Sequence, residues 1–310
     1  MQTSDSAAKS SAQMPGLGKR ALITGMRGFT ARFLEQELLQ AGYQVFGTVL
    51  QASDAENLFA VDLCDRVGLS AVVEQVKPDV VVHLAAIAFV AHNDAEAMYR
   101  VNVVGTRNLL QALADCRHTP SCVLLTSSAN IYGNTSIEPI TEEVVAMPAN
   151  DYAVSKLAME HMARLWFDRL PIIITRPFNY TGVGQAENFL LPKIVSHFRQ
   201  ARGQIELGNL DVARDFSDVR VVVASYRRLL EIAPVGQTFN VCSGVAVSLF
   251  EVLAMMNKMA GYEINVTVNP AFARANEVKR LVGSHAKLQA VIGDVAPIPL
   301  LETLRWMYRV

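Results

Sequence analysis

Short apolar runs alternate with amphipathic stretches through the first 176 residues of the chain. Runs of this kind, bounded by polar or turn-forming residues, predict buried strands. Polar residues are scarce within them, as expected of strands that are covered on both faces. Strands that alternate with helices predict a doubly wound parallel sheet of the α/β class. The runs lie near residues 20–24, 44–49, 58–61, 80–84, 122–126 and 171–175.

The first apolar run leads into a turn with two glycines and then into a helix. The turn, Gly25-Met26-Arg27-Gly28-Phe29-Thr30-Ala31, precedes an amphipathic stretch from Arg32 to Ala41. Glycines permit a tight turn and a close backbone approach, and the free N–H groups of a helix N-terminus attract a pyrophosphate. Ala31, where a third glycine is more usual, is still small enough for helix and strand to pack closely. The turn predicts a Rossmann-type dinucleotide site with cofactor contacts at Gly25, Arg27, Gly28 and Phe29.

Tyr152 and Lys156 stand four residues apart in a stretch that is typical of a helix. Residues at this spacing are neighbours on a helix surface. An ammonium beside a phenol favours the phenolate and lowers a pKa that is about 10 in water. Such a shift would suit general acid-base catalysis at neutral pH. Taken alone, a pair of this kind more often belongs to an ordinary helix surface, and only the other motifs favour a catalytic interpretation.

These two motifs, in this order, resemble the extended short-chain dehydrogenase/reductase family, and the resemblance covers about residues 18–310. Thr126-Ser127-Ser128-Ala129-Asn130-Ile131-Tyr132-Gly133 is similar to the strand end that carries the catalytic serine of the family, with Ser128 at the matching position. Asp62-Leu63 resembles the pair that faces the adenine. Asn102 resembles the asparagine of the central helix that supports the active site. The resemblance implies a catalytic set of Ser128, Tyr152 and Lys156, and further cofactor contacts at Asp62, Leu63, Leu84, Ala85, Ala86, Asn102, Tyr152 and Lys156.

The character of the sequence changes after Arg176. Three segments follow, residues 176–185, 207–219 and 274–280, and each alone would fit a loop or a solvated helix face. Together they resemble the branch of the family that contains GDP-mannose 4,6-dehydratases and GDP-4-keto-6-deoxy-mannose reductases, in which such segments hold the diphosphate of a nucleotide sugar. Arginine suits that task because its planar fork meets phosphate oxygens with two parallel hydrogen bonds. The resemblance implies substrate contacts at Asn179, Arg214, Glu277 and Arg280.

We therefore expect three parts. Residues 1–17 would be a flexible N-terminal extension, residues 18–176 a dinucleotide-binding Rossmann domain, and residues 177–310 mainly a smaller α/β lobe for the nucleotide sugar, with some segments returning to the first domain.

Asn130 bears on the type of reaction. Dehydratases of this branch carry a glutamate two residues after the catalytic hydroxyl, whereas this chain carries Asn130 there, next to Ala129. An amide cannot move protons in that way at neutral pH. The resemblance therefore favours NAD(P)H-dependent reduction of a 4-keto-6-deoxy sugar, GDP-4-keto-6-deoxy-D-mannose to GDP-D-rhamnose or a related product. Tyr152 would protonate O4 and Ser128 would polarise the carbonyl. A 4,6-dehydratase or 4-epimerase is the alternative enzyme, and an NADP-binding redox sensor is the alternative without turnover.

The choice of cofactor depends on the end of the second strand. An acid there would bind the ribose 2′-hydroxyl and favour NAD, but the sequence reads Gly47-Thr48-Val49-Leu50-Gln51. Arg27 is placed as in NADP-using relatives, where an arginine meets the 2′-phosphate, although it would also fit a solvated loop charge. We expect NADP(H), with NAD(H) as the alternative.

Composition narrows the class of protein. The 310 residues are 51% hydrophobic with a formal net charge of −1, which argues against a nucleic-acid partner. No apolar run reaches the length of about 18 residues that a membrane span needs. The spacing of Cys64, Cys116, Cys122 and Cys242 fits neither a zinc site nor a disulfide scaffold, so we expect buried free thiols and a cytoplasmic protein without a metal. The family resemblance implies a homodimer through the helices that carry Asn102 and Tyr152.

Overall fold

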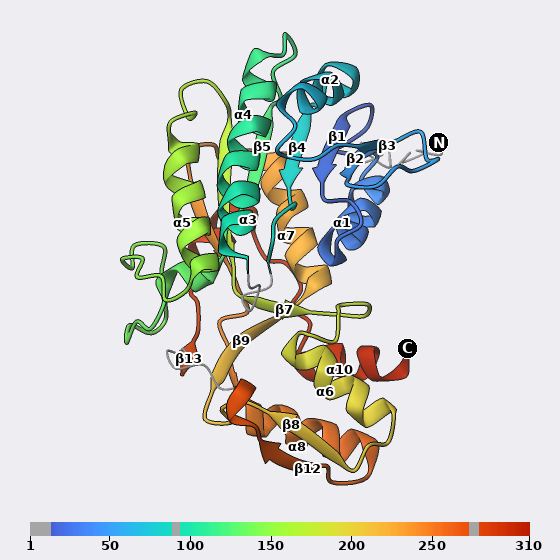
Figure 1. Ribbon diagram of the computed structural model, residues 1–310, viewed down its shortest axis with the longest axis vertical. Coiled ribbons are helices and arrows are strands. Elements are labelled where there is room, and N and C mark those ends of the chain that lie inside the picture. The colour runs from blue at the N-terminus through green and yellow to red at the C-terminus, as the bar shows by residue number, and fades with distance from the viewer. Residues whose placement is uncertain (1–13, 89–93, 273–278) are drawn as a thin grey trace, which may run out of the picture.

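The computed structural model describes residues 14–88, 94–272 and 279–310 and divides into an upper sheet-containing part and a lower lobe (Figure 1). The sheet has seven parallel strands in the order β10-β6-β5-β4-β1-β2-β3. This order confirms the predicted Rossmann-type class. The strands are β1 (Arg20–Thr24), β2 (Gln44–Val49), β3 (Leu58–Ala60), β4 (Val80–His83), β5 (Cys122–Thr126), β6 (Ile172–Pro177) and β10 (Thr238–Val241).

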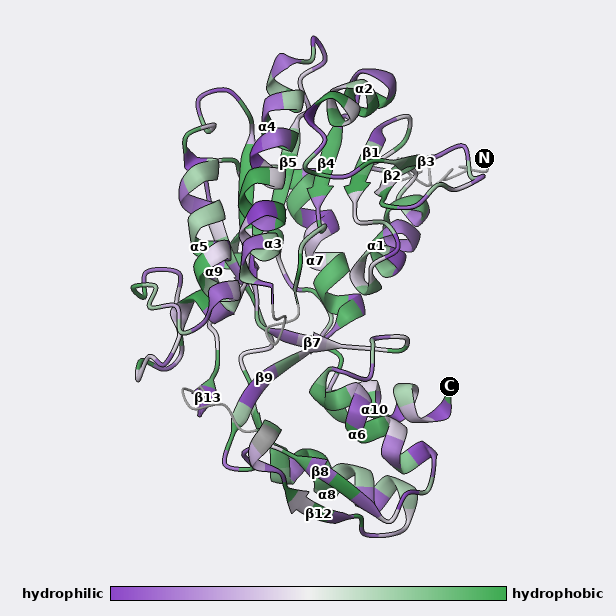
Figure 2. Cartoon of the chain, in the orientation of Figure 1, coloured by the Kyte–Doolittle hydropathy of each residue, from purple (hydrophilic) through white to green (hydrophobic). Residues whose placement is uncertain are grey.

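Helices cover both faces of this sheet. One apolar cluster joins the strands to α1, α7 and α9, and a second joins them to α2, α4 and α5. Figure 2 shows the strands between these layers as hydrophobic, with polar residues on the outer sides of the helices. The helices of this part are α1 (Phe29–Gln40), α2 (Arg66–Val76), α3 (Ala95–Tyr99), the π-helix η1 (Arg100–Gly105), α4 (Thr106–Asp115), the 3-10 helix η2 (Ala129–Tyr132), α5 (Asp151–Arg164), α7 (Val219–Ile232) and α9 (Ala286–Ile292).

The lobe has its own apolar core between three helices and two small sheets. Its helices are α6 (Leu190–Arg199), α8 (Leu249–Ala260), the 3-10 helix η3 (Pro270–Phe272) and α10 (Leu300–Arg309). Its strands are β7 (Asn179–Thr181), β8 (Gln204–Leu207), β9 (Ala213–Asp218), β11 (Ala246–Ser248), β12 (Asn265–Val268) and β13 (Arg280–Leu281). Because α7, β10 and α9 lie in the upper part, the chain passes between the two parts several times (Figure 1).

All six predicted strands are present, but the sequence did not predict β10. Its residues include Asn240, which is fully buried in the middle of the strand. The side chain of Asn240 is bound by residues far away in the sequence: it accepts a hydrogen bond from Tyr132 Oη (2.7 Å) and donates one to Ile140 O (3.0 Å). A buried polar group with tertiary partners interrupts the apolar pattern on which the prediction relied.

The four cysteines are free thiols, but their burial differs from the prediction. Cys116 and Cys122 are buried, whereas Cys64 and Cys242 are half-buried, so the expectation of buried thiols is wrong for the second pair. Within the described part of the chain, no helix is long and apolar enough to cross a membrane.

Candidate active site

The predicted cofactor and catalytic motifs follow three neighbouring strands of the sheet. The glycine turn follows β1, residues 84–88 follow β4, and Ser127-Ser128 follow β5. The strand order β5-β4-β1 makes these strands adjacent. Since all three are parallel, their carboxyl ends meet at one edge, which is where ligands bind in sheets of this class.

The glycine turn is shaped for close backbone approach. Gly25 has φ +74°, and a Cβ at this position would lie 2.9 Å from Ala85 Cα. The turn is held by hydrogen bonds from Met26 N to Thr48 O (2.9 Å) and from Gly28 N to Gly25 O (2.8 Å). Gly28 precedes α1, whose first turn carries no acidic side chain and no side-chain cap. The uncapped N–H groups and the cradle that a Cβ would fill fit the pyrophosphate of a dinucleotide.

The predicted adenosine side of the cofactor site lies at the ends of β2 and β3. Arg27 Nη1 donates to Gln51 Oε1 (3.3 Å), so the guanidinium stands beside the end of β2. Asp62 accepts a hydrogen bond from Cys64 N (2.8 Å), which orders the loop after β3. Leu63 in that loop packs so closely on η1 that a Cβ at Gly105 would lie 2.7 Å from Leu63 Cβ.

His83, the last residue of β4, lies at this edge of the sheet. It is buried between two threonines: Nδ1 is 2.7 Å from Thr24 Oγ1 and Nε2 is 2.9 Å from Thr106 Oγ1. The Thr106 hydroxyl donates its own proton to Asn102 O, so Nε2 is the protonated nitrogen and Nδ1 accepts from Thr24. Burial, with a smaller effect of Lys156, lowers the pKa of His83 to about 3. The ring is therefore a neutral link between β1, β4 and α4.

Asn102 supports the site through the backbone. Its Oδ1 accepts from Ile87 N (2.9 Å), and its Nδ2 donates to Ile87 O (3.1 Å) and to Ser155 Oγ (3.0 Å). Asn102 thus joins the segment that follows β4, with Leu84, Ala85 and Ala86, to helix α5. It lies in a π-helical turn, a distortion that is frequent at functional sites.

Ser128, Tyr152 and Lys156 come together where α5 meets the end of β5. The side chain of Asn150 accepts a hydrogen bond from Ala153 N (2.9 Å) and caps α5, and Tyr152 and Lys156 lie on the first two turns of this helix. Both are buried. The Ser128 side chain lies close enough to Tyr152 to lower the pKa of the phenol, and Lys156 Nζ donates to Thr126 O (2.8 Å). The structure therefore brings the three predicted catalytic residues into one site.

The ionisation of Tyr152 differs from the prediction. Burial raises the pKa of Tyr152 well above its usual value of 10; the Ser128 side chain opposes this rise and nearby Tyr180 adds to it. The expectation that Lys156 lowers this pKa is therefore wrong, because desolvation outweighs the other contributions. Burial also lowers the pKa of Lys156 to about 8, against the opposing effect of Glu160. At neutral pH the site thus holds a protonated phenol and a lysine that is mainly an ammonium.

Tyr180 links the cofactor helix to the lobe, and the sequence gave no signal for this contact. Its hydroxyl is 2.8 Å from Thr30 Oγ1 in the first turn of α1. Its ring stacks on Phe29, with a centroid separation of 6.2 Å. One predicted cofactor residue, Phe29, is thereby held by the segment that begins the lobe.

Three of the predicted substrate residues lie on neighbouring strands of one small sheet. Asn179, at the start of β7, pairs with Phe216 of β9, and Arg280 of β13 pairs with Ala213 of β9. Arg214 follows Ala213 on β9, and its Nη1 donates to Ala213 O and Lys279 O (both 3.0 Å). The fourth predicted residue, Glu277, lies outside the described residues.

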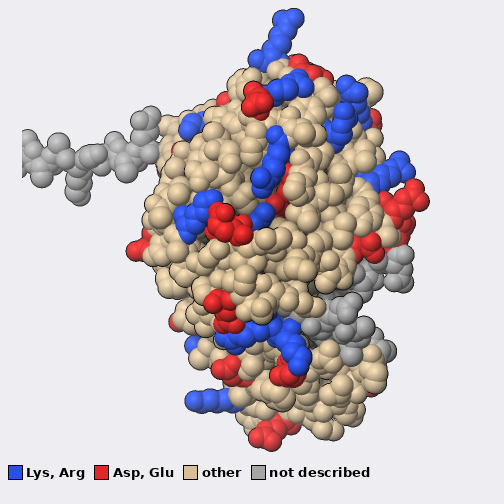
Figure 3. Space-filling model, turned by 90° about the vertical axis from the view of Figure 1, so that its left-hand side faces the viewer, with Lys and Arg blue, Asp and Glu red and all other residues tan. Residues whose placement is uncertain are grey.

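Arg280 is engaged in an ion pair that the sequence did not suggest. Its Nε and Nη2 donate to the two carboxylate oxygens of Glu138, at 2.5 and 2.7 Å. Both side chains are partly exposed. Figure 3 shows basic and acidic side chains gathered on this face where the two parts meet. A phosphate that used the same Nε and Nη2 donors of Arg280 would have to displace Glu138.

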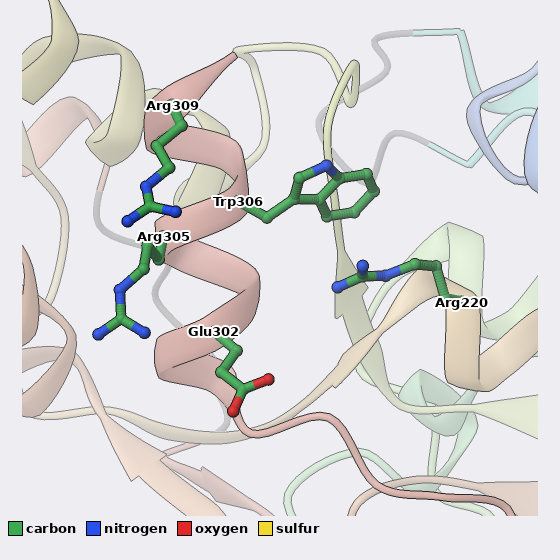
Figure 4. Close-up of a pocket in the computed structure, with 5 residues that line it drawn as sticks. All are labelled: Arg220, Glu302, Arg305, Trp306 and Arg309. Carbon is green, nitrogen blue, oxygen red and sulfur yellow. The ribbon is translucent and has the colours of Figure 1, made fainter.

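A surface cavity of about 310 Å³ lies along α10 (Figure 4). It is lined by Arg220, Glu302, Arg305, Trp306 and Arg309. Arg305 and Arg309 point to one side of α10, and Trp306 points to the other, towards Arg220. The Arg220 guanidinium lies 4.1 Å from the Trp306 ring centre and binds Asp218 with two hydrogen bonds, so both side chains have structural partners. In the described part of the chain, no group of three or more His, Cys, Asp or Glu residues could hold a metal ion.

Comparison with known proteins places the chain in a family. The model of the GDP-mannose 4,6 dehydratase family matches residues 22–307. A GDP-6-deoxy-D-talose 4-dehydrogenase from Aggregatibacter actinomycetemcomitans is 33% identical over 276 residues, 89% of this chain and 92% of that protein. A GDP-6-deoxy-D-mannose reductase from Pseudomonas aeruginosa is 32% identical over 298 residues, 93% of this chain and 95% of that protein.

Solved structures agree with this assignment. RMD from Pseudomonas aeruginosa, in complex with NADPH, superimposes with a TM-score of 0.82 and 31% identity over 94% of this chain and all of that one. A candidate epimerase from Burkholderia cenocepacia gives a TM-score of 0.89 and 52% identity over 95% of this chain and 98% of that one. The predicted resemblance is confirmed, as is the broad class of NAD(P)-dependent oxidoreductases that act on nucleotide sugars. The chain belongs to the GDP-mannose 4,6-dehydratase family of extended short-chain dehydrogenase/reductases.

Proposed function

We propose that this protein is a reductase that converts a GDP-linked 4-keto-6-deoxy sugar into a GDP-6-deoxy sugar. The observation that carries the proposal is the state of the catalytic site: Ser128, Tyr152 and Lys156 are buried together, and burial keeps Tyr152 protonated at neutral pH by raising its pKa. Such a group is ready to donate a proton. Two residues after Ser128, the half-buried Asn130 stands where dehydratases of the branch carry a glutamate. The chain thus has the proton donor of a reduction and lacks the glutamate of the dehydration.

Ser128, Tyr152 and Lys156 would each have a separate role in the reaction. When bound, the nicotinamide cofactor supplies the hydride that reduces C4 of the sugar. Ser128 donates a hydrogen bond to the C4 carbonyl oxygen and polarises it, and Tyr152 then transfers its phenolic proton to that oxygen. Positioned proton transfer of this kind contributes on the order of 10² to 10⁴ in rate. Lys156, as an ammonium, stabilises the phenolate that remains on Tyr152.

NADP(H) is the cofactor that the residues favour. Arg27 stands beside the end of β2 and is bound to Gln51. The glycine turn would place the adenosine ribose of a bound dinucleotide at this strand end, so a 2′-phosphate on that ribose would lie near Arg27. The residues at that strand end include no acid that would select the 2′-hydroxyl of NAD. Comparing the affinities of the protein for NADPH and NADH would test this choice, and an equal affinity would contradict it.

The small sheet of the lobe would hold the diphosphate of the substrate. Arg214 and Arg280 lie on the adjacent strands β9 and β13, and Asn179 lies on β7, which also pairs with β9. Guanidinium groups bind phosphate with charge-assisted hydrogen bonds, and Glu277 would complete the set. The identities of two relatives as GDP-6-deoxy sugar enzymes support GDP as the nucleotide and either a D-rhamno or a D-talo product.

We also propose that two copies associate through α4 and α5. Val154 on α5 and Leu165 just after it are large apolar side chains exposed on this side of the molecule, and Val104 lies exposed on the adjoining η1. Light scattering on the purified protein would test the dimer, and a mass equal to one chain would contradict it.

Epimerisation at C4 is the second candidate, favoured by the 52% identity to the candidate epimerase from Burkholderia cenocepacia. An epimerase returns the hydride to the sugar and consumes no cofactor, so the two functions differ in a single assay. We expect NADPH oxidation with GDP-4-keto-6-deoxy-D-mannose and none with GDP-mannose. Interconversion of sugar epimers without NADPH oxidation would favour the epimerase, and formation of a 4-keto sugar from GDP-mannose would favour the dehydratase.

A further inference from the structure

Arg176 is a buried cation close to the catalytic residues but outside the proposed proton transfer. It lies near the end of β6, and its side chain is 7% exposed. Its Nε and Nη2 donate to the two carboxylate oxygens of Glu160, at 2.9 and 2.7 Å. Its Nη1 donates to Tyr132 Oη (2.9 Å) and to Glu142 O (3.2 Å). One guanidinium therefore binds two side chains and one main-chain carbonyl.

The two side-chain partners of Arg176 belong to the two elements that carry the catalytic groups. Glu160 lies on α5, one helical turn after Lys156 and two after Tyr152. Tyr132 ends η2, the short helix that begins immediately after Ser128. Arg176 thus spans from the helix of the proton donor to the element of the serine that the donor contacts.

The Tyr132 end of this network continues into β10. Tyr132 Oη donates to Asn240 Oδ1 (2.7 Å), and Asn240 N donates to Glu142 Oε1 (2.7 Å). Tyr132 and Asn240 are fully buried, so these bonds fix side chains whose freedom burial already limits. A buried ion pair of this kind is seldom more stabilising than apolar residues of the same size, because desolvation offsets the attraction. Stability alone therefore does not account for the network, whereas directional control of two backbone elements does.

We propose that Arg176 is a positioning residue of the reaction, which holds η2 and α5 together so that Ser128 and Tyr152 keep their contact, while its partner Glu160 keeps Lys156 charged. This inference rests on the proposed reductase function, in which both contacts are needed at the moment of proton transfer. A shift of about 1 Å between catalytic groups can cost roughly 10² in rate.

The charges around Lys156 support the second half of the proposal. The ionisable groups that face it are His83 on β4 and, on its own helix, Tyr152 and Glu160, with Arg176 on β6 beyond Glu160. His83 and Tyr152 are neutral at pH 7. Among these groups, Glu160 is the anion that favours the ammonium form.

Tyr132→Phe tests the positioning directly, because it removes one hydroxyl and keeps the ring. We expect kcat to fall by about tenfold, with KM and the Kd for NADPH unchanged within about twofold. The matched control is Tyr43→Phe in the same part of the molecule, whose buried hydroxyl has no hydrogen-bond partner in the described structure; it should retain the kcat of the wild type. Equal kcat values for the two variants would overturn the positioning role of Arg176.

Glu160→Gln and Glu160→Asp test the charge. In Glu160→Gln we expect the titration midpoint of Lys156 to fall by about one pH unit. The midpoint would be measured by NMR of protein labelled at lysine Cε and from the alkaline limb of the pH profile of kcat/KM. Glu160→Asp keeps the carboxylate, so the midpoint should stay near that of the wild type while kcat falls. An unchanged midpoint in Glu160→Gln would overturn this half of the proposal.

Two further results would also bear on the proposal: a Glu160→Gln variant that does not fold, and a wild-type protein without activity. Glu160→Gln leaves Arg176 without its counter-ion, and should this variant not fold, Tyr132→Phe decides the proposal. Wild-type protein that does not oxidise NADPH with any 4-keto sugar would refute the proposed function, whereas active wild type with an unaffected Tyr132→Phe would refute only this inference. The NMR midpoint needs no turnover and separates the two failures.

Discussion

Lys156 and Arg176, beside the catalytic groups of the upper part, are buried, whereas the ion pair between Arg280 of the lobe and Glu138 is exposed. Lys156 and Arg176 are 4% and 6% exposed, while the side chains of Arg280 and Glu138 are 52% and 39% exposed. Buried polar groups must be fully paired, so their geometry is fixed before any ligand arrives. Exposed ion pairs contribute about 0 to 1 kcal/mol and exchange partners readily. The comparison indicates that the catalytic groups of the upper part have a fixed geometry, whereas the charged groups at the lobe can exchange a protein partner for a ligand.

The lobe is not loosely built beneath this surface. Asp215, next to Arg214 on β9, is fully buried and accepts hydrogen bonds from Ser243 N and Oγ (2.8 and 2.6 Å) and from Gly244 N (2.8 Å). It also accepts a longer bond from Gly283 N (3.3 Å). These bonds tie β9 to the loop after β10 and to the segment after β13. The half-buried Arg214 and the exposed Arg280 thus stand on strands that these bonds hold in place.

The largest effect is expected from Tyr152→Phe, which removes the proton donor and leaves the ring to pack. Turnover should fall by about 10² or more, with NADPH affinity nearly unchanged, as measured by steady-state kinetics and fluorescence titration. Retention of most activity would contradict the assignment of Tyr152 as the general acid.

Arg214→Ala should act on binding rather than on turnover. A charge-assisted contact to phosphate contributes on the order of 1.5 to 3 kcal/mol, so KM for the nucleotide sugar should rise by roughly ten- to a hundredfold while NADPH affinity holds. Arg309→Ala, on α10 of the same lobe, is the matched control and should leave KM unchanged. An equal loss of affinity for sugar and cofactor would mean that Arg214 supports the fold instead.

Activity and overall stability should depend on pH in different ways. With a pKa of about 8, Lys156 loses its ammonium form as the pH rises through that value, so kcat/KM should fall above pH 8, approaching tenfold per unit. The same lysine in the unfolded chain keeps its proton up to about 10.4. Its contribution to stability therefore increases between these values. Loss of activity without loss of melting temperature between pH 8 and 9 is expected, and parallel losses would contradict it.

The smallest effect is expected from Glu138→Gln. Removing the anion that pairs with Arg280 frees the guanidinium to bind phosphate. An exposed ion pair contributes up to about 1 kcal/mol, so its loss corresponds to a two- to fivefold decrease in the KM for the nucleotide sugar. The control Glu56→Gln removes an exposed charge from the upper part and should change nothing. An increase in KM for Glu138→Gln would show that Glu138 orients Arg280 and does not compete for it.

The sequence predicted what local patterns encode. The glycine turn, the buried strands and the spacing of Tyr152 and Lys156 are short-range features, and the structure has each of them. The contacts of His83 with Thr24 and Thr106, and of Arg280 with Glu138, join residues far apart in the chain, so no local pattern reports them. The sign of the Tyr152 shift was also missed, because the spacing from Lys156 says nothing about burial, and burial dominates that pKa.

The most direct test of the central claim follows the hydride. NADPH carrying deuterium on the transferred face of C4, incubated with the protein and GDP-4-keto-6-deoxy-D-mannose, should give a GDP-6-deoxy sugar with one deuterium at C4 of the sugar, as read by NMR and mass spectrometry. In Tyr152→Phe the same product should form at least about 10² times more slowly. A product without deuterium at C4, or unlabelled epimers formed while the deuterated NADPH remains intact, would contradict the account.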